Sequence, residues 1–195
     1  MKYLPALKFP AVALALLLTA VPAFAADETL TLDAAKSKLT FVLGATGHDV
    51  LGDLTLAGGK VVFDRASGVA SGEITLDATK TATGSGSRDK TMHKDVLISA
   101  KFPTIVFKPE KLEGQLAASG KSQIGLRGKI SLVGMEHELL LPAEVEINGN
   151  RVVAKSTFKI PFLDWGLKDP SILFLKVDKE VVVTLQVEGE LAAAP

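Results

Sequence analysis

Cysteine is absent from the 195-residue sequence. Its absence excludes a disulfide-stapled fold, a thiolate metal site, a cysteine nucleophile and a lipid-modified N-terminal cysteine. An excess of one charge sign is absent too, because 22 Lys and Arg residues balance 22 Asp and Glu residues. A nucleic-acid-binding protein needs a basic face that neutralises phosphates. The balanced and scattered charges therefore predict that no nucleic acid is a partner.

Long apolar runs are confined to the N-terminus. Two lysines and an apolar stretch at residues 11–21 precede Ala23-Phe24-Ala25, which has the small-x-small pattern of a cleavage site. The stretch is too short to span the ~30 Å hydrocarbon core of a bilayer, which takes about 20 residues. We therefore predict a cleaved secretory signal peptide over residues 1–25 and one mature domain over 26–195 without a transmembrane segment. An uncleaved N-terminal anchor is the alternative.

Most of the remaining chain alternates between apolar and polar residues. Leu39, Phe41 and Leu43 share one parity. The same period of two recurs at Val61/Phe63, Ile74/Leu76, Ile105/Phe107, Ile130/Leu132, Leu139/Leu141, Val145/Ile147, Phe158/Ile160 and from Val181 to Val187. This pattern is typical of antiparallel strands with one buried face. Because closure leaves no unpaired strand edge, we predict an all-β fold, a single antiparallel barrel of about eight strands.

Two local signals refine this prediction. The turn residues Asn148-Gly149 predict a tight hairpin that joins residues 144–148 to 151–155. The stretch from Arg88 to Ala100 lacks Gly and Pro, and Ser87 before it is a good N-cap. We therefore expect one inserted α-helix near residues 88–99, which plugs one end of the barrel or covers its side.

Catalytic motifs are missing. The sequence contains no Gly-x-Ser-x-Gly elbow, P-loop or dinucleotide fingerprint. Its three histidines, His48, His93 and His137, are far apart along the chain, and none has the i, i+4 partner of a zinc-binding helix. We predict that the protein is not an enzyme, has no catalytic residues and has no metal centre. A shared metal or redox site built from the histidines is the open alternative.

Three stretches carry more specific motifs. They are Asp33-Ala-Ala-Lys-Ser-Lys-Leu-Thr-Phe41, the block Ser87-Arg-Asp-Lys-Thr-Met-His93 with Lys101-Phe-Pro-Thr-Ile-Val-Phe107, and Gly128-x-Ile-x-Leu-x-Gly134. Together they resemble the YceI-like, lipid/polyisoprenoid-binding family over roughly residues 29–190. The resemblance implies a lipocalin-like, eight-stranded barrel in the periplasm, with a long isoprenoid or quinone-like chain in an apolar tunnel. It implies no catalytic machinery and no cofactor other than such a lipid.

The preferred hypothesis is a carrier or sequestering protein whose partner is an apolar chain lipid. Each methylene group transferred from water to an apolar interior contributes ~0.8 kcal/mol, so such a ligand needs few polar contacts. The candidate wall residues are Phe41, Leu43, Phe63, Ile74, Leu76, Ile105, Phe107, Ile130, Leu132 and Phe158. Met92 and Trp165 are the candidates that close the barrel ends.

The alternatives belong to other classes. For each wall candidate, plain core packing is an equal explanation. A filled barrel without a ligand would act through its surface, as a stress-related interaction protein in the periplasm. A continuous apolar tunnel of a few hundred Å³, the size of small-ligand pockets, would distinguish the carrier from the filled barrel. A transient membrane contact and a homodimer are left open.

Overall fold

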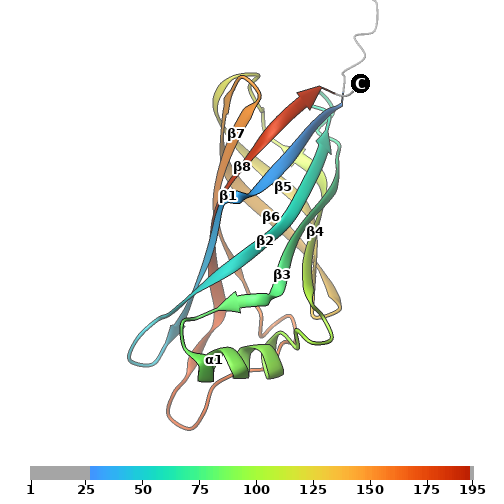
Figure 1. Ribbon diagram of the computed structural model, residues 1–195. Coiled ribbons are helices and arrows are strands. Elements are labelled where there is room, and N and C mark those ends of the chain that lie inside the picture. The colour runs from blue at the N-terminus through green and yellow to red at the C-terminus, as the bar shows by residue number, and fades with distance from the viewer. Residues whose placement is uncertain (1–26, 194–195) are drawn as a thin grey trace, which may run out of the picture.

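The computed structural model describes residues 27–193. The predicted signal peptide at residues 1–25 lies outside the described residues and stays a prediction. Eight strands follow in chain order: β1 (Glu28–Ala45), β2 (Val50–Phe63), β3 (Ala70–Ala82), β4 (Thr104–Glu113), β5 (Gly120–Leu132), β6 (Met135–Asn148), β7 (Arg151–Ile160) and β8 (Val177–Ala193). Each strand pairs antiparallel with the next, and β8 pairs with β1, which closes the barrel (Figure 1). The predicted antiparallel barrel of about eight strands is confirmed.

A bulge in β1 keeps the inner face of the barrel apolar. Asp33 pairs with Glu188 and Lys38 with Gln186, so β1 advances five residues while β8 advances two. Because successive side chains of a strand point to opposite faces, a surplus of three residues moves the inward positions from even to odd numbers. Leu32 and Leu39, on either side of the bulge, are therefore both buried.

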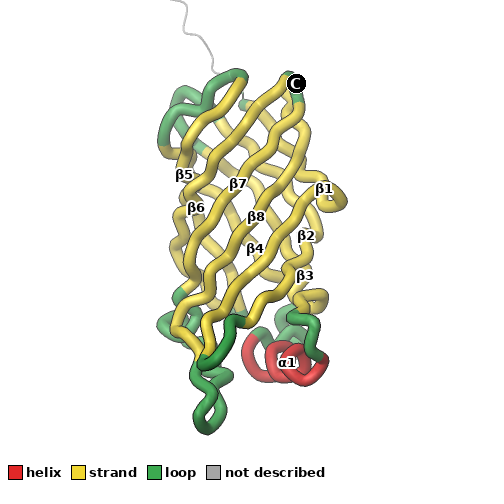
Figure 2. Tube along the Cα trace, turned by 90° about the vertical axis from the view of Figure 1, so that its left-hand side faces the viewer, coloured by secondary structure: helices red, strands yellow, loops and turns green. Residues whose placement is uncertain are grey.

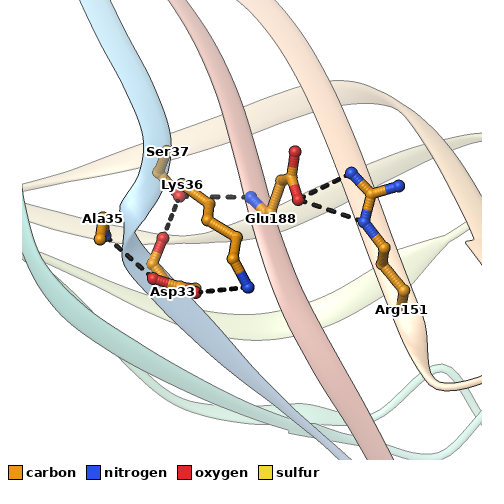
Figure 3. Close-up of polar contacts among 6 residues, drawn as sticks. All are labelled: Asp33, Ala35, Lys36, Ser37, Arg151 and Glu188. Carbon is orange, nitrogen blue, oxygen red and sulfur yellow. Dashed lines mark hydrogen bonds and ion pairs between the residues drawn. The ribbon is translucent and has the colours of Figure 1, made fainter.

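Hydrogen bonds hold the bulge in shape (Figure 3). Asp33 accepts a hydrogen bond from the backbone N–H of Ala35 (3.0 Å) and forms an ion pair with Lys36 (3.1 Å). The Ser37 hydroxyl donates to the carbonyl oxygen of Asp33 (2.7 Å) and accepts from the backbone N–H of Glu188 (3.2 Å). The Lys36 ammonium, aided by the Ala35 N–H, lowers the pKa of Asp33 below its ordinary value. These contacts tie the extra residues to both β1 and β8.

Two further strands change parity in the same way. One surplus residue lies in β2 between Leu56 and Gly58, and one lies in β4 between Pro109 and Lys111. Buried side chains lie on both sides of each bulge: Leu56 and Val61 in β2, Phe107 and Leu112 in β4. An odd surplus is needed each time, because an even one would leave the parity of the inward positions unchanged.

The predicted hairpin between β6 and β7 is confirmed, with a different turn. Asn148 pairs with Arg151, so the two central residues are Gly149 and Asn150 rather than Asn148 and Gly149. Gly149 has a φ of 64°. Glycine adopts this left-handed conformation without the clash that a Cβ atom would cause. The turn therefore depends on Gly149.

The inserted helix lies between β3 and β4, but its limits differ from the predicted residues 88–99. It consists of α1 (Gly86–Thr91) and a π-helical turn, η1 (Met92–Val96), in which the N–H of Leu97 donates to the carbonyl oxygen of Met92 (2.8 Å). The segment ends early because Ile98 has a φ of 46°, which takes the chain out of the right-handed helix. Among the residues that the structure describes, no helix has the length and apolar character needed to cross a bilayer.

The start of the helix also differs from expectation. Its N-cap is Ser85 rather than Ser87, and the Ser85 side chain makes no capping hydrogen bond. Instead, the Asp89 carboxylate accepts hydrogen bonds from the hydroxyl (2.6 Å) and the backbone N–H (2.8 Å) of Thr83. These two bonds lower the pKa of Asp89. The carboxylate thus joins α1 to the chain that leaves β3.

Gly128→Ala should destabilise the barrel strongly. A Cβ at Gly128 would overlap the carbonyl oxygen of Lys108 across the β4–β5 pair, and backbone atoms cannot move aside cheaply. We expect a loss of about 2 kcal/mol or more in the free energy of unfolding, measured by urea denaturation. Gly58→Ala is the control, since nothing lies within 4 Å of its added Cβ. Equal losses in both variants would contradict the packing argument.

Asp89→Ala should lower stability in a pH-dependent manner. Because the folded-state pKa of Asp89 is lowered, its contribution is present above the unfolded pKa of about 4 and is lost as the pH falls through the folded pKa. The difference in unfolding free energy between wild type and variant should therefore shrink as the solution is acidified below about pH 4. Thermal melts at a series of pH values measure it. If the difference in unfolding free energy instead grew on acidification, folding would raise the pKa of Asp89 rather than lower it.

Candidate functional site

The barrel encloses a cavity of ≈ 160 Å³ whose wall is almost wholly apolar. All eight strands contribute side chains to it, together with Leu116 from the loop between β4 and β5. The wall consists of Leu, Ile, Val, Phe and Ala side chains with one exception, Ser156 on β7. The Ser156 hydroxyl is buried and has no hydrogen-bond partner among the described residues. No Asp, Glu, His, Lys or Arg among the described residues borders the cavity.

Seven of the ten candidate wall residues border this cavity: Phe63, Ile74, Leu76, Ile105, Phe107, Ile130 and Phe158. The other three, Phe41, Leu43 and Leu132, do not. They have the inward parity, and Phe41 and Leu132 are buried in a cluster that also contains Phe162 and Leu167, while Leu43 packs against it. The cluster extends to the wall residues Ile105, Phe107 and Ile130, so these three positions are the part of it away from the cavity. Whether the seven contact a ligand stays a prediction.

Residues 161–167, in the connection between β7 and β8, form a plug at the end of the barrel beside α1, here called the helix end (Figure 1). Phe162 and Leu167 are buried in the cluster just described. Their backbones are joined by a hydrogen bond from the N–H of Leu167 to the carbonyl oxygen of Phe162 (3.0 Å). Lys168, just after the plug, forms an ion pair with Asp95 of η1 (3.0 Å). The plug and the helical segment therefore cover the same end together.

The two predicted end residues, Met92 and Trp165, both pack against the plug cluster and are half-buried. The Trp165 ring stacks on the ring of His137, with centroids 4.3 Å apart and planes at 1°. Phe162 and Leu167 are more deeply buried than either, although the sequence analysis did not single them out. They lie outside any strand, so neither follows the period of two that marked the other inward residues.

The opposite end of the barrel holds the C-terminal end of β8 (Figure 1). An arginine joins the chain segments that meet there. Arg65, in the turn after β2, pairs with Glu28 at the start of β1. The same guanidinium donates to the carbonyl oxygens of Leu116 (2.9 Å) and Ala117 (2.6 Å). Since Leu116 also borders the cavity, Arg65 holds the loop that covers the cavity at this end.

Several wall residues were missed by the sequence analysis. Leu30 and Leu32 precede the β1 bulge and have the opposite parity to Leu39, so the alternation around Leu39 does not extend to them. Leu139 and Val183 do follow the recognised alternation, although the candidate set does not include them. The period of two could have found both pairs, since Leu30 and Leu32 alternate with Thr29, Thr31 and Asp33. Only the register between strands shows that Leu30 and Leu32 face the same side as Leu39.

The three histidines lie on three different elements. His48 is exposed in the turn between β1 and β2. In η1, Nδ1 of His93 lies 2.9 Å from the buried hydroxyl of Ser99. His137 is on β6 and stacks on Trp165. No group of three or more His, Cys, Asp or Glu residues within 27–193 is arranged to hold a metal ion. Nε2 of His137 is buried and has no hydrogen-bond partner among the described residues. The predicted lack of a metal centre stays a prediction.

Comparison with known proteins identifies one matching family and several solved structures with a similar fold. The sequence matches the YceI-like domain family over residues 30–189. No curated protein matches it significantly. Among solved structures, BcnA of Burkholderia cenocepacia is similar with a TM-score of 0.64 at 19% identity, over 80% of this chain and 98% of that one.

Two further solved structures share the barrel. One is a polyisoprenoid-binding domain from Saccharophagus degradans implicated in plant cell wall breakdown, with a TM-score of 0.63, 15% identity and coverage of 84% and 98% of the two chains. The other is a YceI protein from Campylobacter jejuni, with a TM-score of 0.55, 18% identity and coverage of 76% and 86%. At these identities the likeness establishes a common fold.

Proposed function

The chain belongs to the YceI-like domain family, and we propose that its barrel binds a long-chain apolar lipid, a polyisoprenoid or an isoprenoid quinone, in the interior cavity. The observation that carries this proposal is the cavity wall, which all eight strands build and in which Ser156 is the only polar residue among those that the structure describes. At ≈ 160 Å³ the cavity is smaller than the few hundred Å³ expected of a carrier, so at this volume it would hold only a segment of such a chain. Apolar cavities of about 150 Å³ do stay dry and take up apolar molecules. The polyisoprenoid-binding domain with the same fold supports the ligand class.

We further propose a carrier or sequestering role in the periplasm, without catalysis and without another cofactor. The predicted signal peptide at residues 1–25 supports this location. The wall supports binding rather than chemistry, since within residues 27–193 it offers no titratable side chain that could act as an acid or base. A ligand held by burial of methylene groups alone can be taken up and released unchanged.

The purified protein should contain lipid, and Ala154→Leu should reduce its amount. Ala154 borders the cavity, so the added carbons occupy space that a lipid chain would need. Because they enter an existing cavity, we expect a melting temperature equal to or above that of the wild type. Val153→Leu, on the outward face of the same strand, is the matched control. Lipids are extracted and identified by mass spectrometry, and their content is expressed per folded molecule.

Two results would overturn the proposal. The first is a wild type that copurifies with no lipid and takes up none from a panel of isoprenoids and quinones. The second is unchanged lipid content in Ala154→Leu together with an intact fold by circular dichroism.

A charge in the wall should abolish lipid retention. Phe107 is buried and borders the cavity, whereas Val106 lies on the opposite face of β4, between Thr75 and Ser131 of the neighbouring strands. In Phe107→Glu the carboxylate would have to lose water at a cost of several kcal/mol or draw water into the cavity. Val106→Glu should retain most of the lipid. Lipid content, circular dichroism and thermal melting are measured together. Equal loss in two folded variants would show that the faces of β4 are wrongly assigned.

A further inference from the structure

Residues Ile172 to Leu175 form an exposed apolar tip between the plug and β8. Eight large apolar side chains among the described residues are exposed, and four of them are consecutive here. The exposed fractions are 64% for Ile172, 88% for Leu173, 89% for Phe174 and 54% for Leu175. Exposed apolar side chains scattered singly are ordinary on a protein surface, but a contiguous group marks a contact site.

The tip is an ordered turn. Ile172 and Leu175 exchange two backbone hydrogen bonds (3.0 and 2.8 Å), which places Leu173 and Phe174 at the apex. Leu173 has a φ of 46°, a conformation that a leucine rarely adopts. The base is also held, since the N–H of Thr46 donates to the carbonyl oxygen of Lys176 (2.8 Å). The turn that exposes these apolar side chains therefore contains a strained backbone residue.

The tip projects beyond the helix end of the barrel, past α1, in both views (Figures 1 and 2). A flat surface that approached this end would therefore meet Leu173 and Phe174 first. A second copy of the chain would need about 800 Å² on each side, drawn from some 20–30 residues, to form a stable interface. Four side chains on a projecting turn do not supply that area. A bilayer needs no complementary shape, because apolar side chains enter it singly.

The neighbouring helical segment carries charge that suits a lipid surface. Arg88, Lys90, Lys94 and Lys101 are all exposed at this end of the barrel. The two acids within residues 86–101, Asp89 and Asp95, leave this stretch a net charge of +2, and Asp95 is paired with Lys168. The exposed cations would attract the anionic headgroups of a membrane towards which the tip points.

We propose that the tip, Ile172 to Leu175, inserts into the surface of an anionic lipid bilayer and docks the helix end of the barrel on it. The occupant of the exposed patch is the interfacial region of the membrane, into which Leu173 and Phe174 penetrate. This inference stands independently of any ligand in the cavity, because it concerns side chains that face away from the interior. It assigns the transient membrane contact considered in the sequence analysis to a definite place in the fold, the tip.

Flotation with vesicles tests the proposal. The mature chain is mixed with vesicles of equal parts phosphatidylethanolamine and phosphatidylglycerol, and the vesicle-bound fraction is measured. The variant Leu173→Ser/Phe174→Ser should bind at least about tenfold more weakly, because it loses both apex side chains. Val69→Ser is the matched control, since Val69 is 62% exposed in the turn between β2 and β3, at the opposite end of the barrel. It should bind like the wild type.

A fluorescence measurement checks how deeply the tip enters the bilayer. Phe174→Trp should show a blue-shifted emission and quenching by brominated lipids when vesicles are added, whereas Val69→Trp should show neither change beyond the signal of Trp165. Unchanged vesicle binding in the double serine variant would overturn the proposal. So would a wild-type dimer in solution that the double variant converts to a monomer, because the tip would then serve a second copy of the chain.

Discussion

The inward positions of the closed barrel must be apolar with few exceptions, such as Ser156, and the rest of the structure depends on that constraint. Closure leaves the inner face without water, so a polar inward side chain has only other side chains as partners. Side chains alternate strictly along a strand, and long strands in a curved sheet need bulges. Bulges with odd surpluses, such as the three residues in β1 and the single residues in β2 and β4, keep both requirements compatible. The polar residues of the β1 bulge then pair on the outside, where Asp33 meets Lys36.

The cavity follows from differences in side-chain size along the axis. At the helix end the inward side chains are large, and Phe41 and Phe162 fill the interior together with the plug. Farther along, β6 and β7 contribute the small side chains of Ala143, Ala154 and Ser156 to the wall. Interiors are otherwise packed to crystal-like density, so small residues at facing positions leave space that the backbone cannot close. The same eight strands thus build a solid end and a hollow middle.

Much of the barrel could be predicted because its period of two is long and regular. Ile105, Phe107 and Ile130 were assigned to the interior from alternation alone, and they border the cavity. That Leu30 shares the inward face with Leu39 could not be assigned in this way, because the parity change at the β1 bulge is visible only in the pairing with β8. Nor could the buried Phe162, which lies in a connection with no period.

The helical segment shows another limit of sequence patterns. Its existence follows from the lack of Gly and Pro, but its end depends on the positive φ of Ile98, a residue type that rarely adopts this conformation. The exposure of Phe174 is likewise a tertiary property. An apolar run in the sequence is read as core until the fold shows that nothing covers it.

The pairing of β1 with β8 also has a consequence for the order of folding. Every other pairing in the barrel joins strands adjacent in the sequence, so its loop closure is much shorter than that of the β1–β8 pair. The β1–β8 seam instead joins residues at the two ends of the described chain, such as Thr29 with Ala192. Because synthesis begins at the N-terminus, one edge of β1 stays unpaired until β8 has been made. During that interval the molecule is a curved sheet with two free edges and an apolar face, the state in which it is most exposed to aggregation and to chaperones.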